Sequence, residues 1–189
     1  SDKVKPMEDF LSKELGIPVK SFVGTNFVAV IEGMGAKTVD VAFLNPFGYV
    51  LASGDYDAEV VLKSVRRGSA QYRAQMVTRT EDNIPVCAEG DTQCTATFAA
   101  LKGKKLAFVD PASTSGYLFP ASFMMGAGLN LEKGQDFSDV IFAGAHDNGA
   151  KSVLNRTVDA AWTFEDVRDN LEAELPNVKE QLTVVAYTE

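Results

Sequence analysis

Few residues of this sequence belong to the kinds that carry metal or nucleic-acid chemistry. The 189 residues include one histidine, one tryptophan and two cysteines, and 18 lysines and arginines stand against 26 aspartates and glutamates, for a net charge of −8. A protein this acidic, without a long basic run, is a poor candidate to bind nucleic acid or an anionic membrane surface. The cysteine pairs and clustered histidines of zinc sites are absent, so we expect neither a metal nor a cofactor.

Long hydrophobic runs are also missing. No apolar stretch reaches the ~18 residues that a membrane-spanning helix needs. The hydrophobic share of 46% and the charged share of 23% are those of an ordinary globular protein, which excludes disordered, collagen-like and coiled-coil classes. A chain of this length can bury about 70% of its unfolded surface, so it can form a substantial core.

Predicted strands and helices alternate along nearly the whole chain. Apolar residues at helical spacing predict helices over 4–15, 27–34, 49–52, 98–101, 115–126, 146–154 and 165–175. Short apolar runs predict strands over 18–22, 40–44, 60–65, 72–78, 105–109, 140–142, 159–163 and 182–187. This alternation indicates an α/β fold with mostly parallel sheets.

The two cysteines, Cys87 and Cys94, flank a turn signal at Gly90 and Asp91. We favour a disulfide across this loop over two free thiols, and a disulfide would indicate an oxidising, extracytoplasmic compartment. Because the loop is short, its closure would add only about 2–3 kcal/mol of stability by chain entropy.

Three hydroxyl residues follow the predicted strand over 105–109. Ser113, Thr114 and Ser115 precede a predicted helix, and Gly116 allows the backbone to approach a ligand closely. The unpaired N–H groups and partial positive charge of a helix start, together with these hydroxyls, suit a tetrahedral oxyanion. The alternative is an ordinary helix cap, in which serine and threonine are common. The segment lacks the Gly-Lys-Ser or Gly-Lys-Thr ending of a nucleotide-binding loop.

His146 follows the predicted strand over 140–142 and begins a predicted helix. That junction places it at the carboxyl edge of a sheet, where ligands bind in open α/β folds. Either ring nitrogen could donate to an oxyanion. The alternatives are a surface histidine and one that caps its own helix.

A hydrolase is a further interpretation of the same residues. Ser113 or Ser115, with His146 and with Asp159 or Asp166, would supply the residue types of a catalytic triad. The Gly-x-Ser-x-Gly pattern of a nucleophile elbow is absent, so catalysis is the less favoured interpretation.

The segment Asp110-Pro-Ala-Ser-Thr-Ser-Gly-Tyr-Leu-Phe-Pro120, followed by Ala-Gly-Ala-His146-Asp147, resembles the phosphate-, phosphite- and phosphonate-binding proteins of ABC importers. Further similar segments lie at 30–34, 39–43, 159–161 and 175–179, so the resemblance runs across almost the whole chain. It implies an α/β fold of the type II periplasmic-binding-protein class, a two-lobed Venus flytrap that holds a small anion between its lobes.

The resemblance also implies which residues contact the ligand. Ser113, Thr114 and Ser115 would hold the phosphoryl oxygens from the second lobe, and His146 would complete that grip.

Three more residues match ligand-side positions of the family. Tyr72 matches a tyrosine near the hinge that contacts the oxyanion. Asp166 matches an acidic position that faces the amine of aminoalkylphosphonates, and it could instead accept a hydrogen bond from a protonated oxyanion. Phe27 stands where the family often has tyrosine, so the ring is retained and the hydroxyl donor is lost.

The resemblance divides the chain into two lobes. Residues 1–77 correspond to a partial first lobe, residues 78–186 to the second lobe and residues 187–189 to the start of a crossover back to the first. A first strand and the C-terminal part of lobe 1 would then lie outside this sequence. A sheet without a central strand exposes apolar edges, which favours a dimer.

These observations lead to one expected function and one close alternative. The expected function is extracytoplasmic capture of a phosphonate, phosphite or phosphate for an ABC permease, with no chemistry performed on the ligand. The alternative is a periplasmic sensory domain that binds the same ligands, because fold does not distinguish transport from sensing. Either protein would be exported to the periplasm or the outer face of the membrane, and a mature form would have lost its signal peptide.

Overall fold

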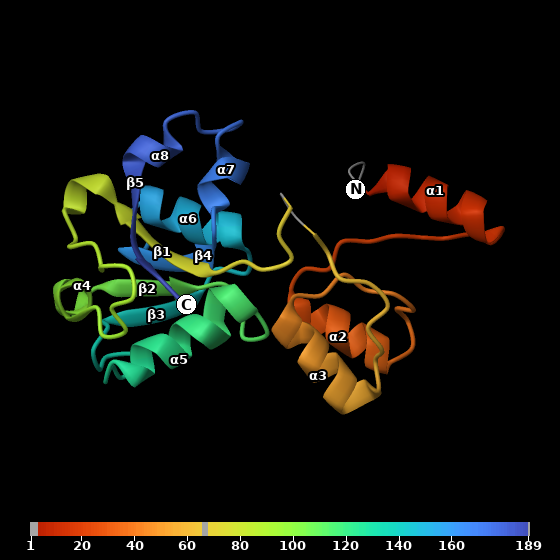
Figure 1. Cartoon of the computed structure of the whole chain (residues 1–189), viewed down its shortest axis with the longest axis horizontal. Coiled ribbons are helices and arrows are strands. Elements are labelled where there is room, and N and C mark those ends of the chain that lie inside the picture. The colour runs from red at the N-terminus through yellow and green to blue at the C-terminus, as the bar shows by residue number, and fades with distance from the viewer. Residues whose placement is uncertain (1–3, 66–67, 189) are drawn as a thin grey trace.

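The computed structural model describes residues 4–65 and 68–188. Figure 1 shows a sheet covered by helices on both faces and, beside it, three N-terminal helices. The helices of the N-terminal part are α1 (Lys5–Leu15), α2 (Phe27–Gly35) and α3 (Pro46–Tyr56). The helices around the sheet are α4 (Thr95–Leu101), α5 (Phe119–Gly126), α6 (His146–Leu154), α7 (Val167–Leu171) and α8 (Val178–Gln181). A 3₁₀ turn, η1 (Thr80–Asp82), and a π-helical turn, η2 (Thr114–Leu118), complete the helical segments of the described residues.

The sheet has five strands in the order β3-β2-β4-β1-β5. Their bounds are β1 (Ala74–Arg79), β2 (Lys105–Phe108), β3 (Asp139–Phe142), β4 (Ala160–Phe164) and β5 (Leu182–Tyr187). β2 pairs in parallel with β3 and β4, whereas β1 runs antiparallel to β4 and β5. The α/β prediction is therefore confirmed, but the sheet is mixed rather than mostly parallel, because β1 enters it at the end where β4 and β5 leave.

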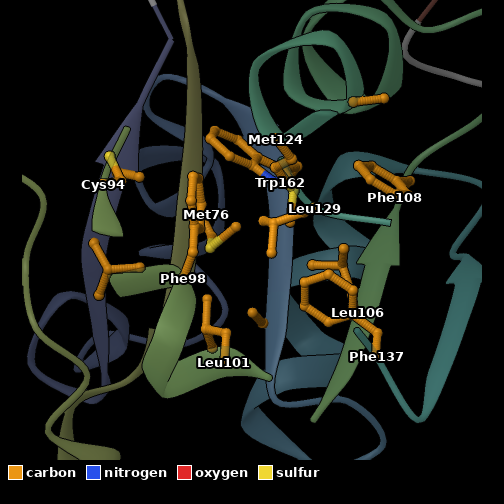
Figure 2. Packing of buried hydrophobic residues seen from close by; sticks show 14 of the residues in the cluster. Met76, Cys94, Phe98, Leu101, Leu106, Phe108, Met124, Leu129, Phe137 and Trp162 are labelled. Atoms are coloured by element: carbon orange, nitrogen blue, oxygen red, sulfur yellow. Dashed lines mark hydrogen bonds between the residues drawn. The ribbon is translucent and has the colours of Figure 1, made fainter. Parts of the chain in front are cut away.

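Alternation of side chains along the strands builds a core on each face of the sheet. In β1, Met76 joins the cluster beneath α4 and α5, and Val77 joins the cluster beneath α6 and α7. Figure 2 shows Trp162 and Met124 in the first cluster. Trp162 is fully buried and its indole N–H lies 3.1 Å from the Met124 sulfur. Trp162 is therefore a core residue.

The predicted strands of the N-terminal part are not formed. Residues 18–22, 40–44 and 60–65 lie outside any strand of the sheet. Most of their side chains are exposed, for example Val41 at 79%, Phe43 at 75% and Leu62 at 88%. The physical reason is pairing: an extended segment becomes a strand only beside a hydrogen-bonded neighbour. Within the described residues, β1–β5 form the one sheet of the structure, and these three segments do not pair with it.

The N-terminal helices are only lightly packed. No residue of α1 is buried, and Figure 1 shows this helix extending away from α2 and α3. The small cluster between α2 and α3 consists of Ile31 and Ala52 together with Ala112, which precedes η2. Ala112 thus links the N-terminal part to the sheet-containing part.

The predicted disulfide between Cys87 and Cys94 is present. The Cα atoms of the two cysteines are 5.0 Å apart. Cys94 is buried at the start of α4, and the Cys87 N–H donates to the Val185 carbonyl of β5 at 2.7 Å. The bridge therefore fastens the loop before α4 to the edge of the sheet.

The predicted boundary between the lobes, at residues 77 and 78, falls inside β1 (Ala74–Arg79). The predicted second lobe contains β2, β3 and β4 and all of β5 except its last residue, Tyr187. Residue 189, the last of the predicted crossover, lies outside the described residues, as do residues 1–3 and 66–67 of the predicted first lobe.

Candidate functional site

Three parallel strands bring the hydroxyl turn of residues 113–115, His146 and Asp166 to one edge of the sheet. β2 ends at Phe108 and leads to η2, β3 ends at Phe142 and leads to α6, and β4 ends at Phe164 and leads to α7. Because β2 is parallel to both neighbours, these three connections leave the sheet on the same side. The edge thus carries the starts of three helical segments, whose N–H groups point outward.

The turn with three hydroxyls is a buried, tightly built helix start. Ser113, Thr114 and Ser115 are each less than 5% exposed. Ser113 caps the turn, since its Oγ accepts the Gly116 N–H at 3.1 Å. A Cβ on Gly116 would lie 2.4 Å from the Cβ of Val109, so only glycine fits there. The close approach predicted for Gly116 therefore serves packing on the strand.

Thr114 is bonded to the N-terminal part of the chain. Its Oγ1 donates to Asn45 Oδ1 at 2.6 Å and accepts the Phe47 N–H at 2.8 Å. Its backbone N–H also donates to Asn45 Oδ1, at 3.3 Å. The first turn of α3 therefore faces the start of η2 directly. Sequence reasoning missed Asn45, although Asn45-Pro46 is a typical cap and first residue of a helix.

His146 is held as a neutral donor. Its Nδ1 accepts the Phe164 N–H at 3.1 Å, and its ring lies edge-on against the Phe164 ring, with centroids 4.7 Å apart. Burial lowers the pKa of His146 to about 4, so the ring is neutral at pH 7. With Nδ1 used as an acceptor, the ring proton resides on Nε2, which is left to donate.

This arrangement of His146 differs from that of a hydrolase triad. In a triad, the Nδ1–H of the histidine donates to a carboxylate. Here Nδ1 faces a backbone N–H instead. Asp159 lies at the opposite edge, before β4, where it accepts from the Lys105 N–H at 2.8 Å and pairs with Arg79.

Asp166 is engaged by its neighbours on both carboxylate oxygens. Oδ1 accepts from Gln75 Nε2 at 2.9 Å and from the Arg168 N–H at 2.9 Å, and Oδ2 accepts from Arg168 Nη2 at 2.6 Å. Partial burial of Asp166 would raise its pKa, but the hydrogen bonds from Arg168 and Gln75 outweigh this effect and bring it to about 2. Asp166 is thus an ionised helix cap with an internal partner.

Tyr72 and Phe27 occupy different surroundings. Tyr72 lies just before β1, in the segment that joins the two parts, and it is 48% exposed. Phe27 is the first residue of α2 and packs, partly buried, against the cluster that contains Ala112. The structure therefore places Phe27 near the approach to η2, and Tyr72 at the connection between the parts.

Two kinds of feature are not found in the part of the chain that the structure describes. No group of three or more histidine, cysteine, aspartate or glutamate side chains is placed to hold a metal ion. None of the helices within 4–65 and 68–188 combines the length and apolar character of a membrane span.

Comparison with known families gives one match that covers the whole chain. Residues 1–189 match the family described as the periplasmic substrate-binding protein of phosphonate ABC transporters. The phosphate-import protein PhnD of Mycolicibacterium smegmatis is 33% identical over 174 residues, which cover 87% of this chain and 50% of that protein. The phosphonates-binding periplasmic protein of Escherichia coli is 27% identical over 183 residues, or 95% of this chain and 51% of that protein. The chain spans about half the length of these two relatives.

Solved structures share the fold at lower identity. A binding protein component of an ABC phosphonate transporter from Pseudomonas aeruginosa superimposes with a TM-score of 0.85 at 23% identity, over 98% of this chain and 59% of that one. PhnD1 from Prochlorococcus marinus, in complex with methylphosphonate, gives a TM-score of 0.84 at 23% identity, over 99% of this chain and 66% of that one.

Proposed function

Since the chain belongs to the family of periplasmic substrate-binding proteins of phosphonate ABC transporters and has their type II fold, we propose that it captures a small tetrahedral phosphorus oxyanion. Phosphonate is the first candidate, and phosphite and phosphate are the others. The observation that carries the proposal is the buried turn of Ser113, Thr114 and Ser115, at the start of a helical segment. The match to the family model supports the choice of ligand class.

The proposed site binds an anion through neutral donors. Thr114 and Ser115 offer hydroxyl and backbone N–H groups, and His146 offers Nε2–H from the neighbouring helix start. Each oxygen of the anion would keep its hydrogen bonds on leaving water, so its charge needs no full countercharge. The dipole of a helix start adds to this stabilisation.

Capture would proceed by closure of two lobes around the ligand. The proposed lobes are residues 1–77 and residues 78–186, with residues 187–189 beginning the return crossover. The second lobe supplies the hydroxyl turn and His146, and the first supplies α2 and α3, with Phe27 at its ligand side. Tyr72 lies at the connection between the lobes, where a hinge residue is expected.

The proposed partner is an ABC permease, and the proposed place of action is the periplasm or the outer face of the membrane. Membership of a periplasmic family supports both proposals. The disulfide between Cys87 and Cys94 agrees with an oxidising compartment. We also propose that no reaction takes place on the ligand, which agrees with His146 Nδ1 facing a backbone N–H rather than a carboxylate.

Removing the hydroxyls of Thr114 and Ser115 tests the proposal. Calorimetric titration against methylphosphonate, phosphite, phosphate and 2-aminoethylphosphonate names the ligand of the wild-type chain. In the double variant Thr114→Ala, Ser115→Ala, we expect binding of that ligand to weaken by at least about 2 kcal/mol, because a hydrogen bond to a charged acceptor contributes about 1.5–3 kcal/mol.

A matched control removes two other hydroxyls. Thr80 and Thr183 hydrogen-bond to each other at 2.9 Å, at the opposite end of β1 from the site. The double variant Thr80→Ala, Thr183→Ala should bind as wild type does. Unchanged affinity in the Thr114, Ser115 variant, or no binding of any of the four anions by the wild-type chain, would refute the proposed site.

A further inference from the structure

We infer that the side-chain oxygen of Asn45 occupies the place of a ligand oxygen on Thr114, so that Asn45 competes with the oxyanion for this residue. The inference rests on the proposed function, because it concerns the same hydroxyl turn. It assigns a role in setting affinity to a residue of the N-terminal part.

The two hydrogen bonds that Thr114 donates to Asn45 converge on one atom. Its Oγ1 donates to Asn45 Oδ1 at 2.6 Å, and its backbone N–H donates to the same oxygen at 3.3 Å. A hydroxyl and an N–H at a helix start, directed at a single acceptor, are what an oxyanion oxygen would receive there. Asn45 Oδ1 therefore uses the donors that the ligand needs.

The charges around this contact favour an anion over an amide. α3 has 11 residues, and the Phe47 N–H in its first turn donates to Thr114 at the start of η2. The positive end of the α3 dipole therefore faces the positive end of the dipole of η2 and α5. A neutral amide oxygen compensates two facing positive ends less well than an anion would. An anion between them would therefore be stabilised from both lobes at once.

The other half of the Asn45 amide is poorly satisfied. Its Nδ2 is buried and has no hydrogen-bond partner among the described residues. A buried donor without an acceptor costs free energy, so the unpaired Nδ2 reduces the net stability of the contact between Asn45 and Thr114. Its Oδ1 would still accept the Gly48 N–H, at 3.0 Å, after leaving Thr114. The side chain can thus cap α3 without contacting Thr114.

These contacts predict how ligand and Asn45 exclude each other. The ligand binds only molecules in which Thr114 is not hydrogen-bonded to Asn45. As the fraction of such molecules falls, the apparent dissociation constant of the ligand rises. A shorter cap at position 45 should raise the fraction, and a negatively charged cap should lower it.

Two substitutions at position 45 test the inference in opposite directions. Asn45→Ser keeps a good helix cap but is too short to reach Thr114. We expect it to bind methylphosphonate at least about threefold more tightly than wild type does. Asn45→Asp also keeps the cap, and it places a negative charge on the donors of Thr114. We expect it to bind methylphosphonate at least about tenfold more weakly.

The matched control is Asn26→Ser. Asn26 caps α2 as Asn45 caps α3, by accepting the Ala29 N–H at 2.8 Å, but it is not hydrogen-bonded to Thr114. Its affinity should equal that of wild type. If wild type binds methylphosphonate but Asn45→Ser binds equally or more weakly, or Asn45→Asp binds equally well, the inference is wrong and the proposed function stands. If wild type binds none of the four anions, both fail.

Discussion

At the scale of single residues, His146 shows how its surroundings fix a protonation state. Its pKa is lowered to about 4 by burial, from 6.5 in an exposed histidine. Above pH 6.5 the ring is neutral in the folded and the unfolded chain. Between pH 6.5 and pH 4 the unfolded chain binds a proton that the folded chain does not, so stability falls as the pH is lowered through this window.

We therefore expect the wild-type chain to lose about 3 kcal/mol of unfolding free energy through His146 between pH 7 and pH 4. In His146→Asn, which cannot titrate there, this part of the loss should be absent. Urea unfolding of both proteins at pH 7 and pH 4 measures how much more stability the wild type loses than the variant. The contributions of the carboxylates, which both proteins share, cancel in this comparison. A histidine resonance that titrates near pH 6.5 in the folded chain would contradict the prediction.

Asp166 illustrates competition between an internal and an external partner. The Arg168 guanidinium bonds both oxygens of Asp166 and also donates to the Leu182 carbonyl at 2.9 Å. A ligand amine at Asp166 would have to displace this group. The contact of Asp166 with a ligand amine, which the family resemblance implies, would therefore depend on Arg168.

We expect Arg168→Gln to favour 2-aminoethylphosphonate over methylphosphonate by about tenfold relative to wild type, since a hydrogen bond to a charged group contributes about 1.5–3 kcal/mol. Calorimetric titration of both ligands gives the ratio. Arg156→Gln, which removes an exposed arginine paired with Glu81, is the control and should leave the ratio unchanged. A ratio equal to that of wild type in Arg168→Gln would show that Asp166 does not face the amine.

Sequence alone could identify residues whose role follows from local chemistry. The turn of Ser113, Thr114 and Ser115 lies between a strand and a helical segment, as predicted. The contact of Asn45 with Thr114 and that of Arg168 with the Leu182 carbonyl could not be predicted, because they join residues 69 and 14 positions apart in the chain. Nothing in the local sequence pattern indicates which distant donor will hydrogen-bond to a given acceptor.

At the scale of elements, the disulfide determines how α4 is attached. α4 begins directly after Cys94 and places Phe98 and Leu101 in the core shown in Figure 2. Cys87 in turn is bonded to β5 through its N–H. Loss of the bridge therefore loosens a short helix whose two core residues depend on its position.

We expect the double variant Cys87→Ala, Cys94→Ala to be less stable than wild type by about 2–3 kcal/mol, the entropy of closing so short a loop. Urea unfolding with and without dithiothreitol measures this effect. Reductant should destabilise the wild type by a similar amount and leave the double variant unchanged. Equal stability of the oxidised wild type and the double variant would contradict the prediction.

Whether a predicted strand forms depends on whether a neighbouring strand is there to pair with it. Residues 105–108, 139–142 and 160–164 form strands close to the predicted ranges because each has a pairing partner. Residues 60–65 have an equally apolar pattern but no partner, and they remain irregular. Apolar content indicates that a segment can join a sheet, whereas pairing decides whether it does.

At the scale of the whole molecule, apolar surface is divided unequally between the two parts. Of the 20 large hydrophobic side chains that are exposed among the described residues, 15 precede residue 73. The sheet-containing part instead buries two clusters, one on each face. Large exposed apolar surfaces and unpaired extended segments promote association with other chains.

We therefore expect the chain of 189 residues to self-associate in a concentration-dependent way, in line with the dimer suggested by its sequence. Val61 and Leu62 are 83% and 88% exposed in an unpaired extended segment, so Val61→Lys, Leu62→Lys should weaken this association through charge repulsion and loss of apolar contact. Met125→Lys, at a 57% exposed site on α5, is the control and should not. Sedimentation velocity over a wide concentration range measures the effect. A wild-type chain that stays monomeric throughout, or an equal effect of Met125→Lys, would show that residues 60–65 do not mediate association.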